Sequence, residues 1–181
     1  MGACKPGITQ IFPAKCIQER IKMENDEEEN PEMAYCEITD EEIPRNHPYF
    51  MYDAEMKLAE AEMGLSIGEG VRLQATRELL DMLDTLYNML KDPDSKLPDS
   101  QRKALNHADD VWLDLKEKMS QGDKRAAHLL SSHAHITLAI SYLVTTRKDE
   151  KFTEFIPDYL IKYLGKLSTF VYREAIGHVM L

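Results

Sequence analysis

Apolar residues recur every three or four positions through most of the chain after Pro48, and this spacing places them on one face of an α-helix. Glycine, proline and aspartate separate the periodic segments, so five helices are predicted. Their expected ranges are 48–64, 69–92, 99–122, 123–149 and 153–181. Four of them are about 20 residues long and the loops between them are short. The predicted fold is therefore an all-α, antiparallel helical bundle of four to five helices, and no strand is predicted.

Two of these helices carry a single apolar stripe with alternating spacings of three and four residues. The stripes are Leu73, Thr76, Leu80, Leu83, Tyr87 and Leu90 in one helix, and Leu105, Ala108, Trp112, Leu115 and Met119 in the other. The segment 129–144 is apolar around much of the helix circumference, which is typical of the most buried helix of a bundle. The glycine-rich residues 64–70 predict a break between the first two helices, and Asp123 is a predicted N-cap.

Residues 1–47 lack helical periodicity and are interrupted by several prolines. Within them, the stretch 23–42 contains ten Asp or Glu residues and no Lys or Arg. Such a segment has too little apolar surface to build a core of its own. The predicted organisation is a long, irregular, acidic N-terminal arm over 1–47, followed by a helical bundle over 48–181.

The arm also contains bulky apolar residues, which a simple spacer would not need. They alternate with the acidic stretches, as expected for a segment that lies across the surface of another protein. The predicted partner-binding residues are Ile8, Ile11, Phe12, Ile17, Ile21, Glu27, Glu28, Glu29, Tyr35 and Ile38.

The charge of the protein is local. The net charge is −10, and the stretch 23–42 accounts for all of it, because the other residues hold 22 acidic and 22 basic groups. The body lacks the concentrated basic face that binding to nucleic acid requires, so no nucleic-acid partner is expected there. The apolar run 129–144 is too short and too polar to span a bilayer, so no membrane segment is expected.

The three cysteines, Cys4, Cys16 and Cys36, all lie in the arm. Their odd number argues against a disulfide framework, and their intervals of 12 and 20 residues do not fit the spacing of zinc ligands. A reducing, cytoplasmic or intracellular location is therefore expected.

Histidines are the main candidates for catalysis or metal binding. His128 and His135 are seven residues apart and share a helix face, as do His107 and Asp110. Antiparallel pairing of their two helices could bring these side chains into an interhelical zinc or iron site. The Glu-x-x-His pair of di-iron bundles is absent. Histidines that are solvated or already hydrogen-bonded are the favoured interpretation, so no enzymatic activity, cofactor or metal is expected.

These patterns favour a non-enzymatic structural or interaction protein. It would be a subunit of a larger assembly and would contact neighbouring subunits through its N-terminal arm. By analogy with other proteins that combine a bundle and an arm, a viral or phage particle is such an assembly. Two alternatives remain open. One is a regulatory protein whose acidic strip binds a basic site on a partner protein. The other is a metal-dependent enzyme that uses the interhelical His/Asp site.

Overall fold

The computed structural model of the protein describes residues 32–70, 74–92, 94–106 and 123–179. Along these residues the elements are β1 (Met33–Cys36), β2 (Glu41–Pro44), α2 (Pro48–Gly68), α3 (Gln74–Asn88), α4 (Asp99–Asn106), α6 (Lys124–Thr146), α7 (Glu150–Thr153) and α8 (Asp158–Val179). The prediction of a helical bundle is confirmed. Among the described helices, none has both the length and the apolar character needed to cross a bilayer.

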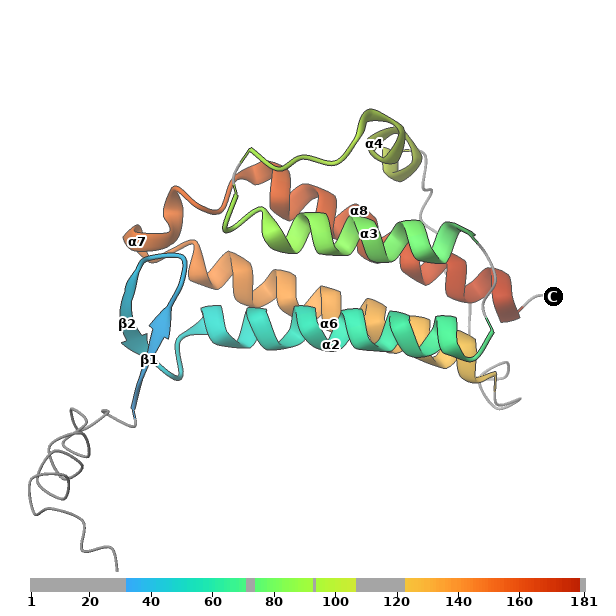
Figure 1. Cartoon of the computed structure of the whole chain (residues 1–181), viewed down its shortest axis with the longest axis horizontal. Helices are drawn as coiled ribbons and strands as arrows, with labels where there is room; N and C mark the ends of the chain where they lie inside the picture. Colours follow the sequence, from blue (N-terminus) through green and yellow to red (C-terminus); the bar gives the residue numbers. More distant parts are fainter. Residues whose placement is uncertain (1–31, 71–73, 93, 107–122, 180–181) are drawn as a thin grey trace, which may run out of the picture.

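The four long helices of the described residues form two layers (Figure 1). In one layer α2 lies beside α6, and in the other α3 lies beside α8. Of the described elements, α6 packs against α2 and α8, whereas α8 packs against α6, α3 and α4. The outward face of α6 is exposed, so the prediction that it is the most buried helix is wrong. The short α4 packs on α8, and the two strands and α7 lie together at one end of the bundle.

The inner faces of α2 and α6 form a regular antiparallel seam. Their buried residues alternate at spacings of three and four, which suits two helices that wind around each other. They are Tyr49, Tyr52, Met56, Ala59, Met63 and Ser66 in α2, and Leu129, Ser132, Ile136, Ala139, Leu143 and Thr146 in α6. Small residues at the middle let the two backbones approach, so that the Ser132 hydroxyl donates a hydrogen bond to the Ala59 carbonyl over 2.9 Å.

The sequence pattern predicted a break between helices from Gly64, and this prediction is wrong. Helix α2 continues through Gly64 to Gly68. An interior glycine costs a helix about 1 kcal/mol, and packing of the last turn against α6 offsets this cost. Ser66 is buried there, and its hydroxyl donates to the Arg125 carbonyl over 3.1 Å.

Residues 33–44 form an antiparallel β-hairpin, although no strand was predicted and this part of the chain was expected to be irregular. Cys36 pairs with Glu41 at the turn, where Asp40 adopts a φ of 53°. Asp tolerates this left-handed conformation better than most residues. Each strand has only four residues, and the second contains two glutamates and a proline. The sequence therefore gives no clear alternation of period two.

The hairpin contributes to the core of the bundle. Three of its apolar side chains belong to the same cluster of buried residues as the helices, namely Cys36, Ile38 and Ile43. The packing of this end of the molecule therefore includes residues from the predicted arm.

The buried face of α3 is rotated relative to the predicted stripe. Its buried side chains are Leu79, Met82, Leu83 and Leu86, and Met89 and Leu90 are buried in the turn that follows the helix. Leu80 and Tyr87, which belong to the predicted stripe, are only partly buried. Apolar residues cover a wide arc of this helix, so spacing alone selected one of two overlapping stripes.

One further helix range differs from the prediction. The helix predicted over 153–181 begins later, at Asp158 after Pro157 (α8), and residues Glu150–Thr153 form a separate short helix, α7. Helix α4 confirms the start of the predicted helix 99–122 and buries Leu105. The rest of that stripe, Ala108, Trp112, Leu115 and Met119, lies outside the described residues, as do the side chains of Leu73 and Thr76.

Asp123 is the N-cap of α6, as predicted. Its carboxylate accepts hydrogen bonds from the backbone N–H groups of Arg125 and Ala126, over 3.0 and 3.2 Å. The hydrogen bond from the Arg125 side chain is the main reason why the pKa of Asp123 is lowered below its ordinary value of 3.8. The folded state therefore favours the charged form of this residue.

Replacing Asp123 by alanine is expected to lower the free energy of unfolding by about 0.5–2 kcal/mol near neutral pH. A lowered pKa stabilises the fold above the unfolded value of about 3.9, and this stabilisation is lost as the pH falls through the folded value. The difference between wild type and Asp123→Ala should therefore shrink between about pH 6 and about pH 3. Urea unfolding at both pH values measures it. Asp123→Asn, which keeps the acceptor without the charge, should retain most of the stability at the higher pH.

Candidate functional site

The outward face of α2 carries a second apolar stripe, on the side opposite to its buried one. We call it the α2 stripe. It consists of Met51, Ala54, Leu58, Ala61, Leu65 and Gly68, all of them exposed and again spaced by three and four residues. Its large side chains are 46% (Met51), 47% (Leu58) and 53% (Leu65) exposed. A surface helix normally presents charged residues on this face, so the α2 stripe is unusual for a helix that faces only water.

The neighbouring face of α6 is also uncharged. No Asp, Glu, Lys or Arg occurs between residues 126 and 146. Its outward positions repeat at spacings of four and three and are mostly small. They are Ala127, Ser131, Ala134, Leu138, Ser141 and Thr145, which we call the α6 stripe. Helices α2 and α6 lie side by side (Figure 1). We infer from the pattern of exposed positions that the two stripes belong to one face of the bundle.

Two histidine–glutamate pairs lie between the stripes and join the two helices. The Nδ1 atom of His135 is 2.6 Å from Glu55, and that of His128 is 2.6 Å from Glu62. A carboxylate only accepts hydrogen bonds, so each Nδ1–H donates. All four side chains are less than a third exposed. The pairs therefore fix the alignment of the antiparallel seam.

The predicted metal site has a different arrangement in the described residues. His128 and His135 do share a helix face, but that face is turned to the two glutamates of α2. His107 and Asp110, their predicted partners, lie outside the described residues. Within the described part of the chain, no group of three or more His, Cys, Asp or Glu residues is placed to hold a metal ion.

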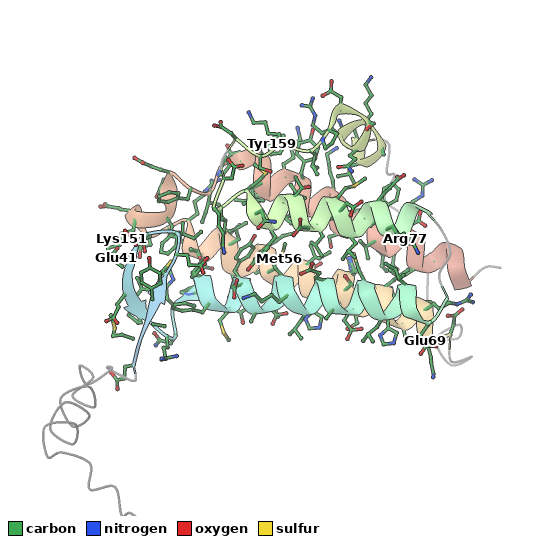
Figure 2. The ribbon with its side chains drawn as sticks, in the orientation of Figure 1. Glu41, Met56, Glu69, Arg77, Lys151 and Tyr159 are labelled. Atoms are coloured by element: carbon green, nitrogen blue, oxygen red, sulfur yellow. The ribbon has the colours of Figure 1, made fainter. Side chains whose placement is uncertain are left out.

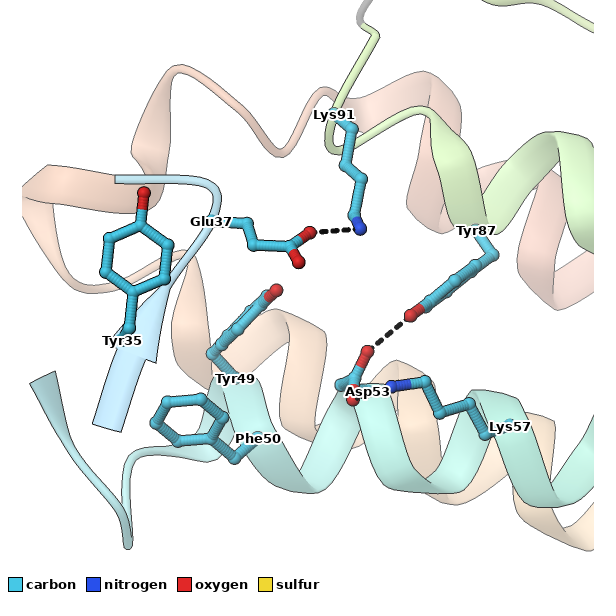
Figure 3. Close-up of a pocket in the computed structure, with 8 residues that line it drawn as sticks. All are labelled: Tyr35, Glu37, Tyr49, Phe50, Asp53, Lys57, Tyr87 and Lys91. Carbon is cyan, nitrogen blue, oxygen red and sulfur yellow. Dashed lines mark hydrogen bonds and ion pairs between the residues drawn. The ribbon is translucent and has the colours of Figure 1, made fainter. Parts of the chain in front are cut away.

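A small pocket lies between the hairpin, the start of α2 and the end of α3 (Figure 3). Its volume is about 130 Å³, and its lining consists of Tyr35, Glu37, Tyr49, Phe50, Asp53, Lys57, Tyr87 and Lys91. This space is well below the several hundred Å³ of a typical small-molecule site.

The polar groups of this pocket bind one another. Asp53 accepts a hydrogen bond from the Tyr87 hydroxyl and forms an ion pair of 2.6 Å with Lys57. Glu37 forms an ion pair with Lys91 (Figure 3). Burial raises the pKa of the Tyr49 and Tyr87 hydroxyls above the ordinary value of 10.0, so both stay protonated at neutral pH. The arrangement favours a structural role for the pocket.

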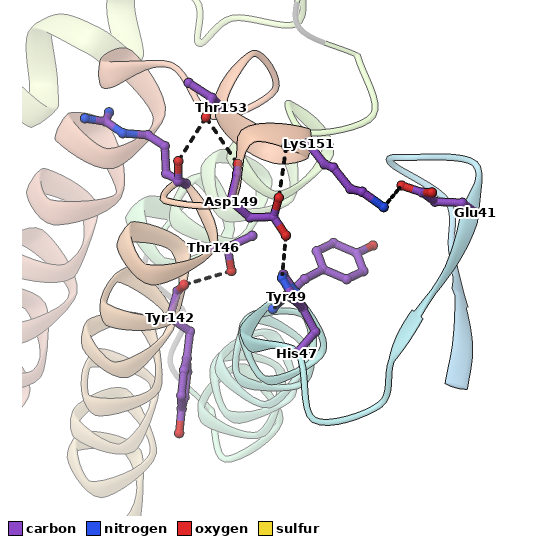
Figure 4. A network of polar contacts seen from close by, with 9 residues as sticks. Glu41, His47, Tyr49, Tyr142, Thr146, Asp149, Lys151 and Thr153 are labelled. Carbon is purple, nitrogen blue, oxygen red and sulfur yellow. Dashed lines mark hydrogen bonds and ion pairs between the residues drawn. The ribbon is translucent and has the colours of Figure 1, made fainter. Parts of the chain in front are cut away.

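A polar network holds the hairpin end of the bundle together (Figure 4). The Nδ1 atom of His47 accepts from the backbone N–H of Tyr49, while its Nε2 lies 3.4 Å from Asp149. Asp149 also caps α7. Lys151 of α7 forms an ion pair of 2.7 Å with Glu41 of the hairpin, and Figure 2 shows these two side chains together at this end. The histidine and the carboxylate are thus both used as helix caps.

The predicted partner-binding residues are only partly within the described chain. Tyr35 lies on the hairpin surface, 58% exposed, and its hydroxyl donates to Asp40. Ile38 packs into the core of the bundle. The others, Ile8, Ile11, Phe12, Ile17, Ile21, Glu27, Glu28 and Glu29, lie outside the described residues.

Part of the acidic strip contacts the protein itself. Glu37 and Glu41 form ion pairs with Lys91 and Lys151 of the bundle. These pairs are largely exposed, and such surface pairs contribute little to stability.

Sequence reasoning missed the α2 stripe, although its signal is present. The spacing of Met51, Leu58 and Leu65 at intervals of seven is visible in the sequence. Spacing alone does not separate it from the buried stripe, because both have the same period and Leu65 lies in the predicted break over 64–70.

None of the curated proteins matches this chain. Residues 35–177, from the first strand into the last helix, match the model of a family described as a domain of unknown function, DUF1940. The match covers well over half of the sequence, and the chain therefore belongs to this family.

Proposed function

We propose that the protein is a non-enzymatic interaction protein and a subunit of a larger protein assembly, and that the outer face of α2 and α6 is its contact surface. One observation carries the proposal. Helix α2 has two apolar stripes on opposite sides, and only one of them is buried in the part of the chain that the structure describes.

The physical argument is that the exposed stripe gains from being covered. Burial of apolar surface contributes about 25 cal/mol per Å², and Met51, Leu58 and Leu65 each leave about half of their surface in water. From Met51 to Gly68 this stripe extends over about 26 Å of the helix. The centres of protein interfaces are depleted in charged residues, as this face is.

The N-terminal arm is a second contact element in this proposal. Its apolar residues, such as Ile8, Ile11 and Phe12, would contact a neighbouring subunit. A viral or phage particle is one assembly that such a subunit suits, by analogy of shape.

The double variant Leu58→Glu/Leu65→Glu tests the contact surface. An extract of cells that naturally make the protein is fractionated by native size, and the chain is detected with an antibody. We expect the wild type to migrate well above its monomer mass of 20.8 kDa. We expect the variant to shift toward that mass, because two new carboxylates on each copy of the chain would weaken association by about a hundredfold or more.

Val144→Glu is the matched control. Val144 is an exposed apolar residue of α6, 41% exposed, but it lies outside both stripes. This variant should keep the wild-type size, and circular dichroism of the purified chains should show the same helix content in all of them. A wild type that migrates as a monomer in the extract, or a double variant of unchanged size, would overturn the proposal.

A further inference from the structure

We propose that the occupant of the α2 stripe is a second copy of this chain, bound through an antiparallel pair of α2 helices related by a twofold axis. This inference rests on the proposed function and names the partner at the same surface. It comes from the order of large and small residues along the stripe.

Large and small side chains alternate along the α2 stripe. The large residues are Met51, Leu58 and Leu65, and the small ones are Ala54, Ala61 and Gly68. In an antiparallel pair centred between residues 59 and 60, Leu58 of one copy faces Ala61 of the other. In the same register, Ala54 faces Leu65 and Met51 faces Gly68.

Every layer of such a pair therefore holds one large and one small side chain. This suits the close packing of protein interiors, where both voids and overpacking are unfavourable. A parallel pair in register would instead place Leu58 against Leu58 and Ala61 against Ala61. Crowded and empty layers would then alternate. The order of sizes favours the antiparallel arrangement.

Helix α6 leaves room for this arrangement. The centre of the pair lies level with Ser132, whose hydroxyl contacts the Ala59 carbonyl. The outward residues of α6 near this level are Ala127, Ser131 and Ala134, which are all small. The twofold axis runs between the two copies, perpendicular to α2 and α6, so α6 would face the α6 helix of the other copy across a surface of small side chains.

The antiparallel pair of α2 helices would bury no unpaired charged side chain at its centre. The nearest carboxylates on the α6 side, Glu55 and Glu62, each accept a hydrogen bond from a histidine of the same copy. On the other side, Lys57 is paired with Asp53. Unpaired charges at an interface are costly, and this face offers none at its centre. The contact uses the same patch on both copies, so it closes as a dimer.

Cysteine cross-linking of the full-length chain tests the register. The background carries Cys4→Ser and Cys16→Ser, while the buried Cys36 stays. Ala54→Cys and Leu65→Cys are made as separate variants, mixed, allowed to exchange subunits and oxidised. We expect a disulfide-linked dimer in the mixture and at least tenfold less in either variant alone. Equal residues would be about 16 Å apart, beyond the Cα separation of about 7 Å that a disulfide spans.

A second pair of variants, Met51→Cys and Gly68→Cys, tests the same register at another position. It is needed in case Ala54→Cys or Leu65→Cys itself prevents the dimer from forming. A Cβ at Gly68 meets no atom within 4 Å, so the fold accommodates the change. Sedimentation of the reduced variants reports their dimer content before oxidation.

Three results would overturn the inference. The first is a cross-link within either single variant, which would indicate a parallel pair. The second is the absence of a cross-link in both mixtures. The third is a purified wild type that sediments as a monomer. The proposed assembly role can hold even if the chain does not pair with a second copy of itself. If the chain in cell extract still migrates as a large complex and still shrinks with Leu58→Glu/Leu65→Glu, the assembly role stands and the partner is a different protein.

Discussion

Phe152→Ala is expected to lower the free energy of unfolding by about 3–5 kcal/mol, a large part of the stability of a domain of this size. Phe152 of α7 is fully buried. Its ring stacks on His47 and Tyr49 at centroid distances of 5.0 and 5.5 Å. Removing the ring leaves a cavity where α7 meets the start of α2. Urea unfolding followed by circular dichroism measures the loss.

The position of the cavity predicts which part of the protein loosens. Backbone amides of the hairpin and of the first turn of α2 should exchange faster with solvent, whereas those in the middle of α6 should change less. Phe152→Leu is the control, because it keeps most of the buried volume and should cost less than half as much. A loss below about 1 kcal/mol in Phe152→Ala would show that the ring does not hold this end of the bundle together.

The helices were predictable where the local sequence determines them. Pro48 and Asp123 mark the beginnings of α2 and α6, because proline suits the first turn of a helix and aspartate suits its N-cap. The break at Gly64 was wrongly predicted, because glycine weakens a helix only locally and contacts with α6 stabilise the last turn of α2. The hairpin was missed for a similar reason, since burial against the helices stabilises its short strands.

The sequence shows the apolar spacing of the candidate site, but it does not show which of the two stripes of α2 is exposed. Sequence spacing places Met56 and Leu58 on opposite sides of one helix, and both stripes have the same heptad period. Which of them is buried depends on packing against α6 and α3, and this is a property of the whole fold. At the contact with α6, the small residues Ala59 and Ser132 allow a close approach of the two helices.

At that close approach, Ala59→Leu is expected to lower the free energy of unfolding by about 1–3 kcal/mol or more. Ala59 is fully buried, and its carbonyl accepts the Ser132 hydroxyl over 2.9 Å. A leucine there would push α2 away from α6 and weaken the two histidine–glutamate pairs that flank it. Urea unfolding of the reduced, purified chain measures this effect.

Ala61→Leu provides a matched comparison, because it makes the same change on the opposite, exposed side of the same helix. Its effect on stability should be within about 0.5 kcal/mol when measured at concentrations where the chain is monomeric. It should instead weaken self-association, because residue 61 of one copy faces Leu58 of the other in the proposed pair. Ala59→Leu should act mainly on folding and Ala61→Leu mainly on association. If both variants lost stability alike, or if Ala61→Leu left the dimer unchanged, the two sides of α2 would not have the separate roles assigned to them: one side for the core of the chain and the other for its partner.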